Sequence, residues 1–405
     1  MRVLWVSDLG CPTGFARVSH SVIKFIKDRL DITGFGINYK GIPHKLGIDL
    51  YPAATNQNDP MGFSKIAATV SQGDYDVIFI LQDAWVIDNY LGTIKAAIDK
   101  DKIPPIVVYF PVDAEEHDPD WYKNFDIVTK AVVYTEFGKK TVQEVAPDLK
   151  LEIIPHGNDK EVFFKKFDSR DDAKKILFKG RDSYPDFLVL NANRNQPRKR
   201  LDITLRGFKI FAEGKDDVAL YMHCGVTDAS IAVDKLAMKL DIDDKIVMSN
   251  LNHGPQAVSE EDLNLFYNAA DVGINTSMGE GWGLTSSEHA MTGAIQIVPD
   301  HSACTELFGD VGILMPTVAD YTFDGVMTKG KLVSPEALAE ALETVYNDRK
   351  AADALAEKAF EKFSSEEYEW ETIAERWYKI LKSAVSVGRI NNLQVPEEGV
   401  PLKKR

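Results

Sequence analysis

The stretch "DVGINTSMGEGWGLTSSEH" (271–289) contains the strongest structural signal in this 405-residue chain. Its apolar start, 271–276, indicates a buried strand, and "LTSSEH" begins a helix, so "MGEGWG" is the turn that joins them. Helix N-termini offer unpaired N–H groups to a phosphate, and glycines let the backbone approach a ligand. Glu280 and Glu288 flank the turn, where they can accept hydrogen bonds from a sugar and from both hydroxyls of a ribose, respectively. Alternatively, the glycines only make a tight turn and Glu288 is a solvated helix residue.

The same alternation of strand and helix extends outward from this unit in both directions. The expected strands are continuous apolar runs, as a parallel sheet covered on both faces requires. They are 2–7, 31–37, 76–81, 105–110 and 131–135 in the first half, and 187–193, 217–223, 244–249, 271–276, 294–299 and 312–316 in the second. This pattern predicts an α/β protein with two Rossmann-like, doubly wound domains in series that face a central cleft. The expected domains are 1–165 and 180–365, with a mobile tail at 386–405.

Composition excludes several classes of protein. With 44% hydrophobic and 27% charged residues the chain is globular, and its three cysteines are far apart and show no metal-binding spacing. They predict neither a disulfide framework nor a metal site, which fits a reducing compartment. The apolar run near the N-terminus is too short for a signal peptide or a membrane span, so we expect a cytoplasmic protein. A net charge of −15 argues against broad non-specific binding of nucleic acid.

Two further loops carry residues suited to phosphate. "LNANRNQPRKRLD" (190–202) follows the first strand of the second domain and places Arg194 and Lys199 in a loop that leads to a helix. Two cations there could neutralise a leaving diphosphate, although a solvated basic loop would look the same. "GCPTGFARVS" (10–19) follows the first strand of the chain, and Gly14 permits close approach to a phosphate at another helix N-terminus.

Taken together, these segments resemble glycosyltransferase family 4, a family of retaining, nucleotide-sugar-dependent enzymes with the GT-B fold. "EGWGLTSSE" matches the family's E-x7-E motif at Glu280 and Glu288, and "NRNQPRK" matches its Arg-x4-Lys element at Arg194 and Lys199. "PTGFARV" stands where the family has its N-terminal glycine loop, and "IPHGNDKEVF" is similar to its entry into the second domain. The resemblance covers most of the chain from residue 1 to 382.

The C-terminal "YEWETIAERW" resembles the family's helix that crosses back onto the first domain, here expected at 366–385. The wording of the second domain is also similar to virus-encoded members, which would place the protein in the cytoplasm of a host. Many family members have a histidine at the carboxyl end of the fourth strand. Here that region reads "YFPVDAEEHD", where Asp113 occupies the expected position and His117 is the alternative.

The resemblance implies retaining transfer of a hexose or pentose from a GDP- or UDP-linked donor to a hydroxyl acceptor, without a cofactor and without a metal. The acceptor would be a polysaccharide, glycan, protein or modified DNA, and the oligomeric state is open. The implied catalytic residues are Arg194, Lys199, Glu280 and Asp113. The implied donor-binding residues are Gly14, Arg194, Lys199, Glu280, Gly281, Trp282, Gly283, Leu284 and Glu288. "DPD" (118–120) and "DID" (241–243) have the spacing of a metal-binding motif, but we interpret both as ordinary loop acids.

Three alternatives stay open at this point. One is a glycosyltransferase acting on hydroxymethylated pyrimidines in phage DNA, for which Lys24, Lys27, Arg29 and the terminal "LKKR" could supply a basic groove. The others are a nucleotide-sugar epimerase and a non-catalytic binding module on the same fold. A dinucleotide-dependent oxidoreductase is unsupported, because the first strand is not followed by GxGxxG. First-domain loops, including the unusual segment 37–62, would hold the acceptor.

Overall fold

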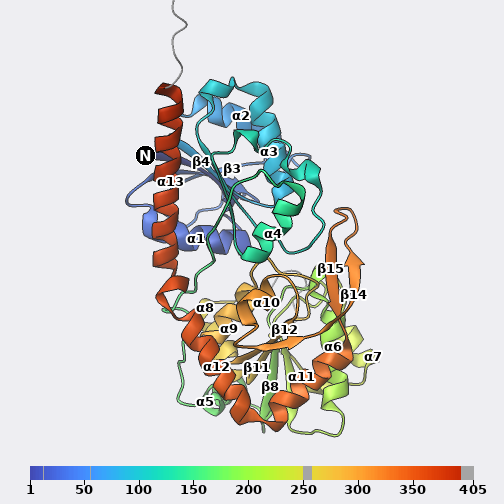
Figure 1. The fold of residues 1–405 in the computed structure, drawn as a ribbon. Coiled ribbons are helices and arrows are strands. Elements are labelled where there is room, and N and C mark those ends of the chain that lie inside the picture. Colours follow the sequence, from blue (N-terminus) through green and yellow to red (C-terminus); the bar gives the residue numbers. More distant parts are fainter. Residues whose placement is uncertain (12, 55, 250–257, 394–405) are drawn as a thin grey trace, which may run out of the picture.

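The computed structural model describes residues 1–11, 13–54, 56–249 and 258–393. It consists of two α/β lobes, one above the other in Figure 1, with a long C-terminal helix running beside the upper lobe. Each lobe is built on one parallel sheet, of seven strands in the first and six in the second. The predicted architecture of two doubly wound domains is therefore confirmed.

The sheet of the N-terminal domain has the order β3-β2-β1-β4-β5-β6-β7, and all of its pairs are parallel. Its central strands are buried along nearly their whole length, which explains their continuous apolar sequences. The strands are β1 Arg2–Asp8, β2 Asp31–Ile37, β3 Asp49–Pro52, β4 Val77–Leu81, β5 Ile106–Phe110, β6 Lys130–Val133 and β7 Leu151–Ile153. The chain changes direction across the sheet between β1 and β4, and such a switch point opens a crevice at the carboxyl ends of the strands.

Helices cover both faces of this sheet. They are α1 Gly14–Ile26, α2 Phe63–Gln72, α3 Ala84–Ala97 and α4 Glu136–Val145, with 3-10 turns at Lys100–Lys102, Pro119–Tyr122 and Phe125–Ile127. Two of the helices begin with a threonine whose hydroxyl accepts a backbone N–H of the first turn. In α1 this residue is Thr13, so the helix starts at the crevice beside β1.

The sheet of the C-terminal domain has the order β10-β9-β8-β11-β12-β13, with a switch point between β8 and β11. Its strands are β8 Phe187–Asn191, β9 Val218–Met222, β10 Ile246–Met248, β11 Val272–Ile274, β12 Ile295–Pro299 and β13 Ile313–Met315. Its helices are α5 Arg170–Leu177, α6 Leu201–Ala212, α7 Val233–Lys239, α8 Glu260–Ala269, α9 Leu284–Ala290, α10 Ala303–Phe308, α11 Pro335–Asn347 and α12 Arg349–Phe363. Short 3-10 turns lie at Pro197–Lys199, Asp243–Lys245 and Glu366–Tyr368. Ser259 and Ser334 cap α8 and α11, and serine is among the residues preferred at this position.

Two elements were not predicted. One is the edge strand β3, and the other is the antiparallel hairpin of β14 (Thr317–Thr322) and β15 (Lys329–Val333). Both are polar and largely solvent-facing, so neither shows the continuous apolar run that marks the other strands. The extra strand corrects the count along the chain: residues 105–110 contain the fifth strand rather than the fourth, which is β4.

Helix α13 (Trp370–Leu393) joins the two domains. It packs along α1 of the N-terminal domain, and the ring of Trp377 contacts Phe79 of β4 and Tyr109 of β5. The helix continues through residues 386–393, which were expected to begin a mobile tail, while 394–405 lie outside the described residues. Among the helices that the structure describes, none combines the length and the apolar character needed to cross a membrane.

Candidate functional site

Two adjoining cavities lie where the domains face each other. We call them the inner cavity, of about 550 Å³, and the outer cavity, of about 830 Å³. The residues that line both are Asp83, Pro111, Asp113, Gln196 and Arg198. The rest of the inner lining is Asp8, Thr13, Gly14, Phe15, Tyr134, His156, Asn193, Arg194, Lys199, Glu280, Gly281, Trp282, Gly283, Leu284 and Thr285.

The position of the inner cavity follows from the topology. Its lining includes the loops after β1 and β4 in the N-terminal domain and the loops after β8 and β11 in the C-terminal domain. These four loops flank the two switch points, where doubly wound sheets bind their ligands. The expected donor loops thus meet in one place, although they come from distant parts of the chain.

The glycine turn brings the domains together. A Cβ atom on Gly279 would lie 1.8 Å from the carbonyl oxygen of Asp113, and one on Gly281 would lie 2.9 Å from Cβ of Pro111. Gly283 has φ of 94°, a left-handed conformation that favours glycine. By contrast, a Cβ on Gly14 would meet nothing closer than a Leu284 methyl at 4.0 Å. The turn glycines therefore make room for the opposite domain, whereas Gly14 leaves space in the cavity.

Glu280 lies at the centre of the inner cavity in a buried charge cluster. Its carboxylate accepts hydrogen bonds from Lys199, from Arg198 at 3.2 Å and from the side-chain amide of Asn275 at 3.0 Å. Burial raises the pKa of Glu280, but Lys199 and Arg198 outweigh it and lower that pKa to about 2. Glu280 is therefore ionised at neutral pH and fixed in place.

Arg194 and Lys199, the two cations that the sequence predicts for the diphosphate, have different partners in the structure. Lys199 contacts Glu280 as part of the charge cluster. Arg194 also lines the inner cavity, but its guanidinium is bound by Asp228, at 2.5 and 3.2 Å, and is not in contact with the turn. Arg198, which the spacing argument passed over, donates to the carbonyl of Gly279 and to Glu280 and so occupies the central position.

Asp113 and His117 lie in different places. Asp113 lines both cavities, and one of its carboxylate oxygens is 3.3 Å from Nε of Arg198. His117 lines only the outer cavity, where its Nδ1 is 2.6 Å from the hydroxyl of Tyr122. Burial lowers the pKa of His117 to about 4, so its imidazole is neutral at pH 7.

Asp83 is a second site residue, besides Arg198, that the sequence argument missed. It follows β4, which is the true fourth strand, and it lines both cavities beside Asp113. Burial, assisted by the negative charge of Asp113, raises the pKa of Asp83 to about 7. The switch-point rule would have identified it, because β4 flanks the switch point of the first sheet.

Glu288 faces the N-terminal domain from α9. The residue is 7% exposed, and its carboxylate is 3.5 Å from Nε of Arg17 on α1 and 3.3 Å from the hydroxyl of Tyr267 on α8. Burial raises the pKa of Glu288 to about 7, against the opposing effects of Arg17 and Tyr267. It is therefore a buried group in an interdomain contact, and the interpretation as a solvated helix residue is wrong.

Three buried polar side chains in the inner wall have unused hydrogen-bonding groups. The hydroxyl of Tyr134, both ring nitrogens of His156 and the indole N–H of Trp282 have no protein partner among the described residues. The three rings pack against one another, with His156 between the other two. Buried polar groups are nearly always hydrogen-bonded in proteins, so these unpaired groups behind the inner cavity are exceptions to that pattern.

The described residues contain no cluster of three or more His, Cys, Asp or Glu side chains arranged to hold a metal ion. In the "DPD" segment, Asp118 accepts the backbone N–H of Asp120 and so caps a 3-10 turn. This contact agrees with the interpretation of that segment as loop acids.

The sequence matches the model of a known protein family. Residues 155–376, more than half of the chain, match the model of a family described as "Family 4 Glycosyltransferase in conflict systems". A mannosylfructose-phosphate synthase of Agrobacterium fabrum is 26% identical over 158 residues. This aligned segment covers 37% of the present chain and only 33% of that relative, so the match spans about a third of the synthase.

Solved structures share the whole architecture. A sucrose-phosphate synthase of Thermosynechococcus elongatus superposes with a TM-score of 0.73 and 15% identity, covering 96% of this chain and 100% of its own. The HepE protein of Anabaena, in complex with UDP and glucose, gives a TM-score of 0.68 and 17% identity over 95% of this chain and 100% of its own. At such identities the likeness establishes the GT-B fold and nothing beyond it.

Proposed function

Because the chain belongs to the family 4 glycosyltransferases of conflict systems, we propose that it transfers a hexose or pentose from a nucleoside diphosphate sugar to a hydroxyl group, with retention at the anomeric carbon. The donor is GDP- or UDP-linked. Two of the similar proteins support this choice of chemistry: one is named a synthase of a mannose-containing sugar phosphate, and another holds UDP and glucose. The activity remains a proposal, because the sequence match covers only a third of the named synthase.

The observation that carries the proposal is the joint lining of the inner cavity. It combines the start of α1 at Gly14, the cations Arg198 and Lys199, and the turn 280–284 within one interdomain space. In this arrangement the diphosphate lies against the cations and the sugar lies beside Glu280, next to the wall that contains Tyr134 and His156. Glu288 accepts hydrogen bonds from the two ribose hydroxyls after its ion pair with Arg17 has opened.

The reaction needs no covalent intermediate on the protein. Glu280 is held by two cations and has a strongly lowered pKa, which makes it a poor nucleophile and a good anchor. The acceptor oxygen therefore attacks the anomeric carbon on the face that the diphosphate leaves. A phosphate oxygen takes the acceptor proton, and Arg198 and Lys199 stabilise the charge that develops on the leaving group. Two protein cations at this position support transfer without a metal.

A thermal-shift panel tests the donor. UDP-, GDP-, ADP- and TDP-sugars are added to the wild type and to Lys199→Ala and Glu288→Ala, with Lys209→Ala on the exposed side of α6 as the control. A ligand that binds only the folded state raises the melting temperature. At a ligand concentration of a hundred times its Kd, it increases the free energy of unfolding by about 2.7 kcal/mol. We expect one donor to stabilise the wild type and the control, and both site variants to weaken this shift. If no nucleotide sugar shifts the wild type at saturation, the transferase proposal fails.

The stereochemistry and the metal requirement need a separate measurement. Proton NMR of the newly formed glycosidic linkage is expected to show the anomeric configuration of the donor. Turnover is expected to be unchanged by EDTA, because Arg198 and Lys199 neutralise the leaving group. An inverted product would contradict the retaining mechanism, and loss of turnover on chelation that a divalent cation restores would contradict the metal independence.

The basic residues that could favour DNA as the acceptor are engaged elsewhere. Lys24 lies 3.4 Å from Asp159, Arg29 lies 2.6 Å from Glu375, and Lys27 donates to the carbonyl of Leu46. These contacts hold the cations against protein groups along α1, and the terminal "LKKR" lies outside the described residues. The DNA-modifying alternative therefore gains no support from this surface.

A further inference from the structure

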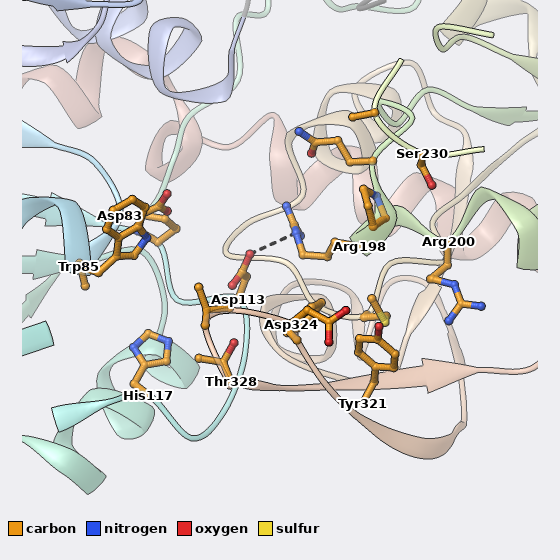
Figure 2. A pocket seen from close by; sticks show the side chains of 18 of the residues that line it. Asp83, Trp85, Asp113, His117, Arg198, Arg200, Ser230, Tyr321, Asp324 and Thr328 are labelled. Carbon is orange, nitrogen blue, oxygen red and sulfur yellow. Dashed lines mark ion pairs between the residues drawn. The ribbon is translucent and has the colours of Figure 1, made fainter. Parts of the chain in front are cut away.

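The outer cavity is open beside the inner one and has walls from both domains. Figure 2 shows Asp83, Trp85 and His117 on the side of the N-terminal domain, and Tyr321, Asp324 and Thr328 on the hairpin of the C-terminal domain. Its volume of about 830 Å³ lies in the range of roughly 300–1,000 Å³ that is typical of small-molecule sites. The two cavities adjoin at the residues that line both, so an acceptor bound in the outer cavity would lie next to a donor bound in the inner one.

The hairpin β14–β15 is fixed across the domain interface rather than free. Glu115 and Lys329 exchange two backbone hydrogen bonds, of 2.8 and 2.9 Å, and form an isolated antiparallel bridge between the domains. The Lys329 ammonium is also 3.1 Å from Glu115 and 2.9 Å from Glu116. Tyr321 and Asp324, which belong to the C-terminal domain, are therefore held in position as one wall of the outer cavity.

The charges in the outer cavity disfavour an anion. Its described lining contains two permanent cations. Arg198 donates to Gly279 and Glu280 of the inner cavity, and Arg200 is bound by both oxygens of Asp202 at 2.9 and 2.7 Å. The acidic side chains of Asp83 and Asp324 lie on opposite walls, and neither forms an ion pair with a cation of this lining among the described residues. A phosphate placed here would face Asp324 and an Asp83 that is partly ionised at pH 7, because its pKa is about 7, without a cation directed at the phosphate.

The remaining lining includes several aromatic rings. Trp85 is 37% exposed at the rim, and Trp121, Tyr321 and Phe323 complete the apolar surface together with neutral His117. Sugar rings present apolar C–H faces and a polar edge of hydroxyls. Aromatic rings can cover the faces, while carboxylates accept hydrogen bonds from neighbouring hydroxyls.

We propose that the outer cavity is the acceptor site, and that it selects an uncharged sugar that lies between Trp85 and Tyr321, with the hairpin as its donor-domain wall. The inference rests on the proposed glycosyltransferase function and narrows the acceptor to one chemical class. It excludes sugar phosphates and DNA, although similar proteins include enzymes named as sugar-phosphate synthases.

The first experiment compares acceptors directly. With the donor identified by thermal shift, release of nucleoside diphosphate is measured with methyl glucoside, methyl mannoside, maltose and cellobiose. The same measurement is made with glucose 6-phosphate, fructose 6-phosphate and an oligonucleotide containing hydroxymethylcytosine. We expect at least one neutral sugar to accelerate release above the hydrolysis by water, and the phosphate-bearing compounds not to do so. Preferred turnover of a phosphate-bearing compound, or no acceleration by any neutral sugar, would overturn the inference.

The second experiment tests the walls. Trp85→Ala and Tyr321→Ala are expected to raise the acceptor KM about tenfold or more, since each removes an aromatic face. Donor Kd should stay unchanged, because neither side chain lines the inner cavity. Val318→Ala is the matched control, because Val318 lies on the same hairpin, is 62% exposed and does not line the cavity. Tyr321→Phe keeps the ring and should retain most of the affinity.

A charge change gives the converse result. Asp324→Lys places a cation on the hairpin wall and should improve the use of glucose 6-phosphate relative to neutral sugars. If the wall variants match Val318→Ala in acceptor KM, the cavity does not hold the acceptor and the inference is wrong, while donor binding still supports a transferase. If the wild type neither binds nor hydrolyses any donor, the proposed function itself fails and this inference falls with it.

Discussion

At the scale of single residues, the pair of Lys199 and Glu280 decides how the inner cavity handles charge. Lys199→Met is expected to lower kcat by about 10²–10³-fold, because it removes a cation that stabilises the leaving diphosphate. Glu280 keeps its contacts with Arg198 and Asn275, so the fold should survive. Steady-state kinetics with the preferred donor, beside Lys209→Met as a control, measure the effect. A kcat equal to that of the control would remove Lys199 from the mechanism.

Glu288 predicts a pH dependence of donor binding. Its pKa of about 7 means that the carboxylate, the form that accepts ribose hydroxyls, becomes scarce as the pH falls below neutrality. Donor Kd is expected to increase as the pH is lowered from 8 to 6. Well below the pKa, the increase approaches about tenfold for each pH unit. The groups that face this carboxyl are Arg17 on α1, and Glu260 and Tyr267 on α8.

The variant Glu288→Gln isolates this contribution. Its donor Kd should be weaker at pH 8 and nearly flat over the same pH range, as isothermal titration would show. The raised pKa also has a consequence for the free protein: ionisation of Glu288 is less favourable in the folded state. Stability without ligand should therefore decline as the pH rises between 4.5 and about 7. An unchanged slope in Glu288→Gln would assign the pH effect to another group.

The sequence identified part of this residue set and missed the rest for definite physical reasons. Lys199, Glu280 and Gly14 line the inner cavity as motif spacing predicted. Arg198 was passed over because the direction of its side chain depends on the 3-10 turn at Pro197–Lys199, which spacing alone does not reveal. Asp83 was missed because its position follows from the strand order of the sheet, and one strand had not been counted.

At the scale of elements, the glycine turn after β11 is a contact between domains. Gly279→Ala would place a methyl group 1.8 Å from the carbonyl oxygen of Asp113, so the domains must move apart. We expect a larger radius of gyration by small-angle X-ray scattering, and a kcat/KM reduced by roughly 10²-fold through the misplaced site. Gly14→Ala is the contrasting variant, since its methyl group enters open space and should affect donor binding without separating the domains. Unchanged scattering for Gly279→Ala would show that the turn adapts locally.

Elements with strong periodic signals were predicted, and elements defined by their partners were not. The buried strands and the capped helices α8 and α11 follow from local sequence, because burial on both faces and N-capping each leave a direct signature. The hairpin β14–β15 leaves none: its residues are polar and exposed, and the bridge between Glu115 and Lys329 that fixes it joins distant segments. The candidate acceptor wall was therefore invisible until the fold was known.

At the scale of the whole molecule, three sets of contacts hold the cleft in a closed arrangement. Arg17 reaches Glu260 and Glu288, Arg198 links Asp113 to Glu280, and the hairpin pairs with the loop after β5. Most of these contacts involve groups that also line the two cavities or, as Glu288, are proposed to bind the donor. In the proposed function, substrate binding would therefore engage side chains that also join the two domains.

Helix α13 connects the C-terminal domain to the N-terminal domain, and a substitution at Trp377 tests how much this contact contributes to stability. Trp377 is fully buried against Phe79 and Tyr109, and its indole N–H has no partner in the described structure. Trp377→Ala is expected to cost about 3–5 kcal/mol of unfolding free energy and to split urea unfolding into separate transitions of the two domains. Trp377→Phe keeps one aromatic ring and loses the unpaired N–H together with part of the buried ring volume, so it should be less damaging than the alanine variant. If the phenylalanine variant is as unstable as the alanine one, the retained ring does not stabilise the contact with Phe79 and Tyr109. If the alanine variant unfolds in one step at wild-type stability, α13 does not hold the domains together.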